Sequence, residues 1–167
     1  IDAKNVNAQA NLGVLLHFQG SYAEAIPHLR AALSLQPDLW RIQALLGIAE
    51  KRTGNLGQAL TNLEQSFPHL ANDKTGIQFG LELVEIYGAA AQFEKALAVA
   101  AKLTQLAPND PQVLLATYQI ARQTMDQATI NIMLAAPDSP ESHMIMAGEF
   151  AREGNQAKAE SEYRAAI

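Results

Sequence analysis

The sequence contains no cysteine, and this absence excludes three kinds of chemistry. Disulfide bonds, thiolate nucleophiles and zinc sites built on cysteine all need that side chain. The GxSxG turn of serine hydrolases and the glycine-rich loop that holds phosphates are missing too. Four histidines are present, without the spacing of a metal-binding motif: His17, His28, His69 and His143. The sequence therefore predicts no catalytic residue, no cofactor-binding residue and no metal ligand.

Basic residues are also scarce, with 12 Lys and Arg against 17 Asp and Glu, and the net charge is -5. Nucleic-acid binders usually concentrate cations on one face, so we expect no nucleic-acid partner. No apolar run approaches the roughly 20 residues that cross a bilayer, so we expect no membrane insertion. No feature of the sequence indicates a compartment.

A short motif recurs after 34 residues. The residues that return at this offset are Leu12-Gly13 with Leu46-Gly47, Gly20 with Gly54, Ala25 with Ala59, and Leu29 with Leu63. A fixed period of this length indicates that one small supersecondary unit has been copied. Stacked arrays of such units present long surfaces and rarely build a catalytic pocket.

Apolar residues at helical spacing predict pairs of helices joined by short turns. The expected helices cover residues 7–18, 21–35, 40–53, 56–67, 77–90, 93–106 and 111–124, and two more begin at Pro140 and Gln156. Ser21 and Glu24 have the spacing of a capping box. Asn55, Asp110 and Ser139 occupy the positions of helix N-caps. Strand signals are absent, so the sequence predicts an all-α chain.

The fourth unit is irregular because it is short. Ala128 comes early, and Pro137 is expected to stop the second helix of this unit after about three turns, at 3.6 residues per turn. We therefore expect a helix pair with a shortened second member over residues 111–139. A boundary between two stretches of array is a further interpretation of this irregularity.

The recurring positions resemble the tetratricopeptide repeat, whose period is 34 residues. The first unit carries the family pattern in Leu12, Gly13, Leu16, Gly20, Ala25, Leu29, Ala32 and Pro37. The resemblance implies a right-handed α-solenoid of stacked antiparallel helix pairs, in which small residues such as Gly13 and Gly47 lie where two helices cross closely. It implies about five repeats in a single array over residues 1–167: 6–39, 40–73, 77–110, 111–139 (degenerate) and 140–167 (truncated). Neither end carries a polar capping repeat, so we expect an excerpt of a longer protein.

In this family the first helix of each pair lines a concave groove that holds a peptide or helix of a partner. The resemblance thus implies a non-catalytic protein–protein interaction scaffold with a protein or peptide partner and no cofactor. The candidate groove residues are Asn7, Asn11, Val14, Phe18, Arg41, Ile48, Lys51, Arg52, Gln78, Glu82, Glu85, Gln119 and Arg122. Arg41, Lys51 and Arg52 form a predicted basic spot with Glu82 and Glu85 beside it.

Two alternative functions stay open at this point. The array could be the substrate-recruiting region of a larger enzyme, or a structural module for homo-oligomerisation through self-association. Two single residues also carry expectations. Trp40, the only tryptophan, is expected to pack between repeats, and Glu50 is expected to be partly exposed or paired with Lys51 or Arg52.

Overall fold

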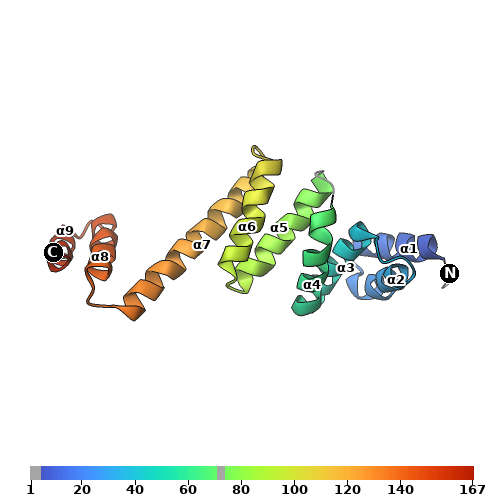
Figure 1. Cartoon of the computed structure of the whole chain (residues 1–167), viewed down its shortest axis with the longest axis horizontal. Coiled ribbons are helices and arrows are strands. Elements are labelled where there is room, and N and C mark those ends of the chain that lie inside the picture. Colours follow the sequence, from blue (N-terminus) through green and yellow to red (C-terminus); the bar gives the residue numbers. More distant parts are fainter. Residues whose placement is uncertain (1–4, 71–73) are drawn as a thin grey trace. The chain divides into compact units, whose positions relative to one another are not determined.

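The computed structural model describes residues 5–70 and 74–167, and over these residues the chain is all-α with no strand (Figure 1). The helices are α1 (Val6–Phe18), α2 (Tyr22–Leu35), α3 (Trp40–Arg52), α4 (Leu56–Ser66), the short 3₁₀ helix η1 (Phe67–His69), α5 (Lys74–Ala89), α6 (Phe93–Leu106), α7 (Pro111–Ala135), α8 (Pro140–Arg152) and α9 (Gln156–Ala165). The predicted helical-solenoid fold is confirmed. The expected end of the second repeat, residues 71–73, lies outside the described residues.

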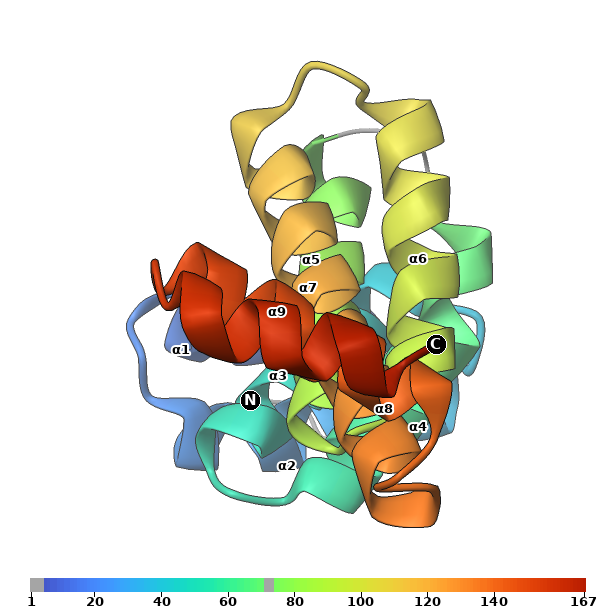
Figure 2. The ribbon, with the colours of Figure 1, turned by 90° about the vertical axis from the view of Figure 1, so that its left-hand side faces the viewer.

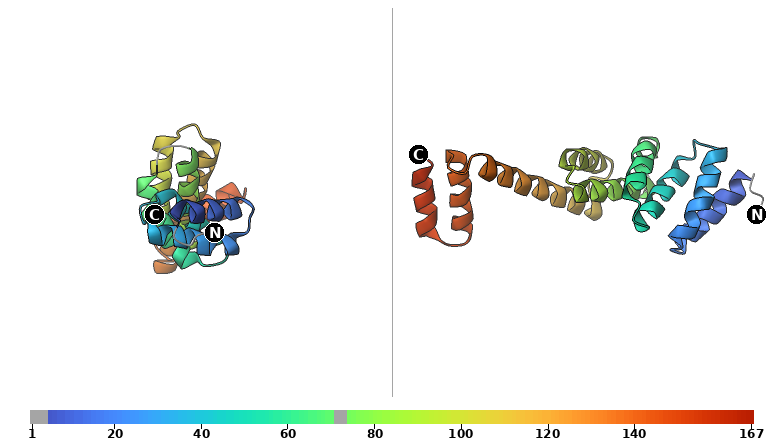
Figure 3. Two further views of the ribbon diagram at one scale, coloured as in Figure 1. Left: turned by 90° about the vertical axis from the view of Figure 1, so that its right-hand side faces the viewer. Right: turned by 90° about the horizontal axis from the view of Figure 1, so that it is seen from below.

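The chain divides into two compact units, and the division falls inside α7. Unit 1 (Ile1–Ile120) contains the helix pairs α1/α2, α3/α4 and α5/α6, with α2 packed on α3 and α4 on α5. Figure 2 shows the loop that joins α6 to α7. Unit 2 (Ala121–Ile167) contains the pair α8/α9, whose two helices lie side by side in Figure 3. A single array across both units stays a prediction.

Each helix pair turns at one residue with a positive φ angle. These residues are Gly20 (78°), Gly54 (85°), Ala91 (54°) and Gly154 (78°). Glycine has no Cβ and adopts this conformation without a steric cost, which explains why it fills three of the four turns. The turn residue is therefore the local signal that makes the chain double back.

The expected helix pair over residues 111–139 is wrong, because α7 is one uninterrupted helix of 25 residues. Met125 stands one period of 34 residues after the turn residue Ala91. Methionine is a good helix former, and the segment around it contains neither glycine nor proline. Nothing interrupts the helix until Ala135, two residues before Pro137.

Glycines allow the helices of unit 1 to cross closely, as expected. A Cβ atom added to Gly13 would lie 2.7 Å from Leu29 Cδ2, and one added to Gly47 would lie 2.8 Å from Leu63 Cγ. Gly80 fills the same role beside Leu103 Cδ2, at 2.6 Å. A Cβ atom at any of these distances would force the neighbouring leucine to move, so close packing favours glycine at these positions.

The caps agree only in part with the sequence. Asp110 accepts the Gln112 backbone N–H at 2.8 Å, and Ser139 accepts the Ser142 backbone N–H at 3.2 Å. The predicted capping box is wrong, because the Ser21 side chain makes no capping bond and its ψ of 57° is not extended. Asn55 precedes α4 as predicted, but its side chain bonds Thr53 Oγ1 instead.

Candidate interaction surface

Helix α1 presents a stripe of exposed side chains along one face. Asn7, Asn11, Leu15 and Phe18 follow one another at intervals of four, four and three residues, which places them on the same side of a helix. Phe18 is 78% exposed and Leu15 is 54% exposed. Val14, beside them, is half-buried. The sequence analysis did not include Leu15 among the candidate residues, although its helical spacing from Asn11 and Phe18 indicates that it lies on the same face.

Ion pairs connect the first helices of the second and third repeats. Lys51 Nζ on α3 lies 2.6 Å from Glu82 Oε2 and 2.6 Å from Glu85 Oε2, both on α5. Arg52 adds a contact of 3.1 Å to Glu82 Oε1. The Lys51 and Glu82 side chains are 10% and 9% exposed, so this pair is largely removed from water. Glutamates of the next repeat therefore neutralise two of the three cations in the predicted basic spot.

His17 lies near this charged group and within an aromatic cluster. Its ring makes edge-to-face contacts with Phe18 and Tyr22, at centroid distances of 5.6 and 5.3 Å. Burial lowers the pKa of His17 from its usual 6.5, and the Arg52 charge lowers it further. The imidazole beside the exposed stripe of α1 therefore takes up a proton less readily than a free histidine does.

The candidate groove residues differ in how accessible they are. The exposed ones are Asn7, Asn11, Phe18, Arg41, Arg52, Gln78, Glu85, Gln119 and Arg122. Val14 and Lys51 are half-buried, while Ile48 and Glu82 are buried. Ile48 belongs to the hydrophobic core, and Glu82 is held by its two cations. The set as a binding site stays a prediction.

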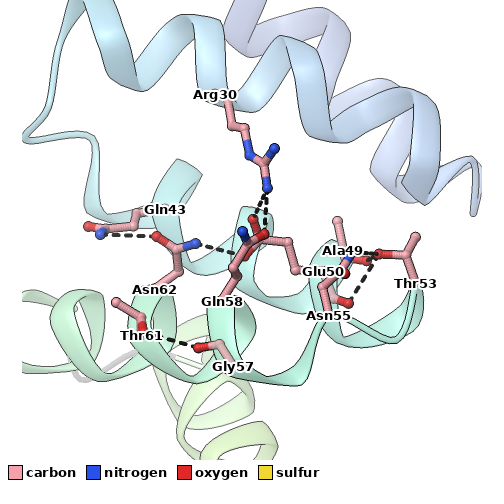
Figure 4. A network of polar contacts seen from close by, with 10 residues as sticks. All are labelled: Arg30, Gln43, Ala49, Glu50, Thr53, Asn55, Gly57, Gln58, Thr61 and Asn62. Carbon is pink, nitrogen blue, oxygen red and sulfur yellow. Dashed lines mark hydrogen bonds and ion pairs between the residues drawn. The ribbon is translucent and has the colours of Figure 1, made fainter.

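A second polar network lies between α2, α3 and α4, around Glu50 (Figure 4). Glu50 is 1% exposed, and Arg30 of α2 donates to its Oε1 at 2.7 Å. Asn62 of α4 donates to Glu50 Oε2 at 2.7 Å, and Arg30 also donates to Gln58 at 2.7 Å. The expectation that Glu50 is partly exposed or paired with Lys51 or Arg52 is wrong. Successive residues of a helix point about 100° apart, so Lys51 and Arg52 point in other directions than Glu50. Both contact Glu82 of α5 instead.

An open pocket of about 720 Å³ adjoins this network. Arg30, Leu33 and Pro37 line it from the first repeat, and Gln58, Thr61 and Asn62 line it from α4. This pocket is thus lined by residues of the second helices α2 and α4 together with Gln43, Leu46 and Glu50 of the first helix α3.

Trp40 packs against the end of its own repeat, whereas the sequence predicted that it would pack between repeats. The indole ring stacks on His69 of η1, with ring centroids 3.9 Å apart and planes inclined by 10°. Trp40 therefore fixes the start of α3 against η1.

Residues 5–70 and 74–167 hold no group of three His, Asp or Glu side chains that could bind a metal ion. Within the same ranges, no helix combines the length and the apolar character of a membrane span.

A family model described as tetratricopeptide repeat matches residues 6–39. This range is the first predicted repeat, α1 with α2 and the turn at Gly20. The match covers one repeat, so residues 6–39 of this chain form a tetratricopeptide repeat. Repeats of this family typically form protein-interaction modules that are not catalytic.

Solved structures of several other proteins share this fold. MamA (MSR-1) is 18% identical with a TM-score of 0.62, and the match covers 96% of this chain and 94% of that one. TTC0263 of Thermus thermophilus is 21% identical with a TM-score of 0.58, covering 97% and 90%. Human IFIT1, solved as a dimer with m7Gppp-AAAA, is 16% identical with a TM-score of 0.53, covering 98% of this chain and 42% of that one. No curated protein matches the sequence.

Proposed function

We propose that unit 1 holds an extended peptide or a helix of another protein along α1, α3 and α5. The observation that carries the proposal is the exposed stripe of α1, which ends in Phe18. An aromatic ring that is 78% exposed on a helix is a suitable anchor, because aromatic residues, phenylalanine among them, are enriched in protein–protein interfaces.

The surface around this stripe supports the same interpretation, because it is already formed before a partner binds. The Lys51–Glu82 and Arg52–Glu82 contacts join α3 to α5 and fix the neighbouring first helices. A preformed surface loses little conformational entropy on binding. Asn7 and Asn11 offer amide groups beside the anchor, while Gln78 and Glu85 offer polar groups on α5.

Site-specific photocrosslinking tests the proposal. A photoreactive phenylalanine analogue placed at Phe18 should capture a partner protein, and the same analogue at Leu56 should not. Leu56 is the matched control because it is also exposed, at 53%, but lies on the second helix α4.

The captured segment is then titrated as a synthetic peptide. Phe18→Ala should weaken binding about tenfold, which corresponds to about 1.4 kcal/mol. Leu56→Ala should leave the affinity unchanged. Equal crosslinking at both positions, or a loss of affinity with Leu56→Ala alone, contradicts the assignment to the first helices.

A further inference from the structure

Helix α7 carries an apolar stripe with the spacing of a coiled coil. Its members alternate at intervals of four and three residues: Leu114, Tyr118, Ala121, Met125, Ala128, Ile132 and Ala135. This heptad spacing keeps one side of a helix against one partner helix over its whole length. The only charged residues of α7, Arg122 and Asp126, are not part of the stripe.

The whole stripe is exposed in the structure. Tyr118 is 63% exposed, Met125 59%, Leu114 47% and Ile132 39%, and the three alanines are exposed as well. A different side of α7 faces the core of unit 1, where Val113 and Ile120 are buried. The stripe is therefore available to a partner without any change in the packing of unit 1.

The stripe is complementary to itself when one copy is reversed. In an antiparallel alignment centred at the level of Gln123, Leu114 faces Ile132, Tyr118 faces Ala128 and Ala121 faces Met125. A large residue meets a small one in two of these layers, and two branched aliphatic residues meet in the third. Each layer also pairs an a position of one helix with a d position of the other, as in antiparallel coiled coils. An isologous contact of this kind is how twofold dimers form.

We propose that two copies of this chain pair antiparallel through α7, with Leu114, Tyr118, Ala121, Met125, Ala128 and Ile132 of each copy in the seam. A second copy fits better than an unrelated helix because the large and small side chains of the stripe complement those of the same stripe running in the opposite direction. A hairpin within one chain would need a turn near Gln123, and α7 has neither the glycine nor the positive φ that the other turns use. One helix pair forms a small interface, so the dimer is expected to depend on concentration.

Light scattering of the whole chain over a wide range of concentrations is the first test. We expect the average mass to rise from that of a monomer to twice that value. Met125→Glu should hold the protein at the monomer mass, since it places two carboxylates in the seam. Gln119→Glu is the matched control, because it adds the same charge to α7 at an exposed position away from the stripe. Circular dichroism verifies that both variants keep their helix content.

Thiol crosslinking then tests the register, and the absence of native cysteine makes each introduced thiol unique. Ala121→Cys mixed with Met125→Cys should form a mixed disulfide dimer, as should Leu114→Cys with Ile132→Cys. Efficient homodimer crosslinking of Leu114→Cys alone would indicate a parallel pair and overturn the proposed arrangement. A monomer mass at every concentration overturns the proposal altogether, and so does a dimer that persists in Met125→Glu.

Discussion

Units 1 and 2 contain the same kind of helix pair but bury different side chains. In unit 1 the fully buried residues include Leu29, Leu63 and Leu83. In the described part of unit 2 only Ser142, Ala147 and Ala159 are buried, and all three are small. A helix pair hides large apolar residues only when neighbouring pairs cover it, as expected for a repeat array.

The two units also differ in how deeply they bury their charged residues. Glu50 of unit 1 is 1% exposed and bonds to both neighbouring second helices. In unit 2, Arg164 and Glu160 pair within α9 while their side chains stay 77% and 66% exposed. An exposed pair of this kind contributes little to stability, whereas a buried carboxylate depends on its partners.

The largest expected effect comes from one repeat position that the two units share. Leu63 and Tyr163 each lie four residues after a buried alanine, Ala59 or Ala159, but Leu63 is 0% exposed and Tyr163 is 42% exposed. Leu63→Ala should lower the free energy of unfolding by about 3 kcal/mol, because it opens a cavity. Tyr163→Ala should cost about 1 kcal/mol or less. Urea unfolding followed by circular dichroism measures both, and equal losses would contradict the comparison.

Helix glycines give the next largest contrast. A Cβ at Gly47 would lie 2.8 Å from Leu63 Cγ and 3.0 Å from the Ala59 carbonyl oxygen, whereas a Cβ at Gly148 meets no atom within 4 Å. Gly47→Ala should therefore destabilise the protein by about 2 kcal/mol through overpacking. Gly148→Ala should raise its stability by up to about 1 kcal/mol through helix propensity. The same denaturation experiment distinguishes the two signs, and a stabilising Gly47→Ala would count against the close helix crossing.

Removing one arginine from each unit should have a smaller effect. Among the contacts drawn in Figure 4, Arg30→Ala leaves Asn62 as the remaining side-chain donor to the buried Glu50. We expect the free energy of unfolding to fall by about 1.5 kcal/mol. The control, Arg164→Ala, should cost less than about 0.5 kcal/mol. If Arg30→Ala were as mild as its control, Glu50 would not depend on that cation.

The smallest effect is a dependence of stability on pH. Because the pKa of His17 in the fold lies below 6.5, the unfolded chain takes up the proton first as the pH falls. The contribution of His17 to stability is therefore complete above pH 6.5 and decreases as the pH falls through that value. His17→Gln should remove this part of the pH dependence, while the control His143→Gln in unit 2 should retain it. Melting temperatures measured across this range provide the test.

Much of the fold follows from local sequence signals. The turn glycines Gly20, Gly54 and Gly154 and the crossing glycines Gly13 and Gly47 predict helix pairs with nearly correct bounds, since each acts within its own repeat. The continuous α7 was missed because the family pattern was extended through a segment that has no turn residue. Met125 at the turn position is the signal that would have corrected the prediction.

The candidate site is less predictable because it depends on contacts between repeats. The exposure of Asn7, Asn11 and Phe18 follows from helical periodicity on α1 alone. The contacts of Glu50 with Arg30 and of Lys51 with Glu82 join residues 20 and 31 positions apart. Which charges meet across such a separation is decided by how neighbouring repeats stack, and no local motif encodes it.

The surroundings of Glu50 set a lower limit on the pieces into which this protein can be dissected. A fragment that begins after Arg30 lacks one hydrogen-bond donor to the Glu50 carboxylate, and a fragment that stops before Asn62 lacks another. Repeats are often exchanged as interchangeable blocks in protein engineering, but here the second repeat should be moved only together with the first. The smallest unit to transfer is thus the first two repeats together, which the Glu50 side chain joins.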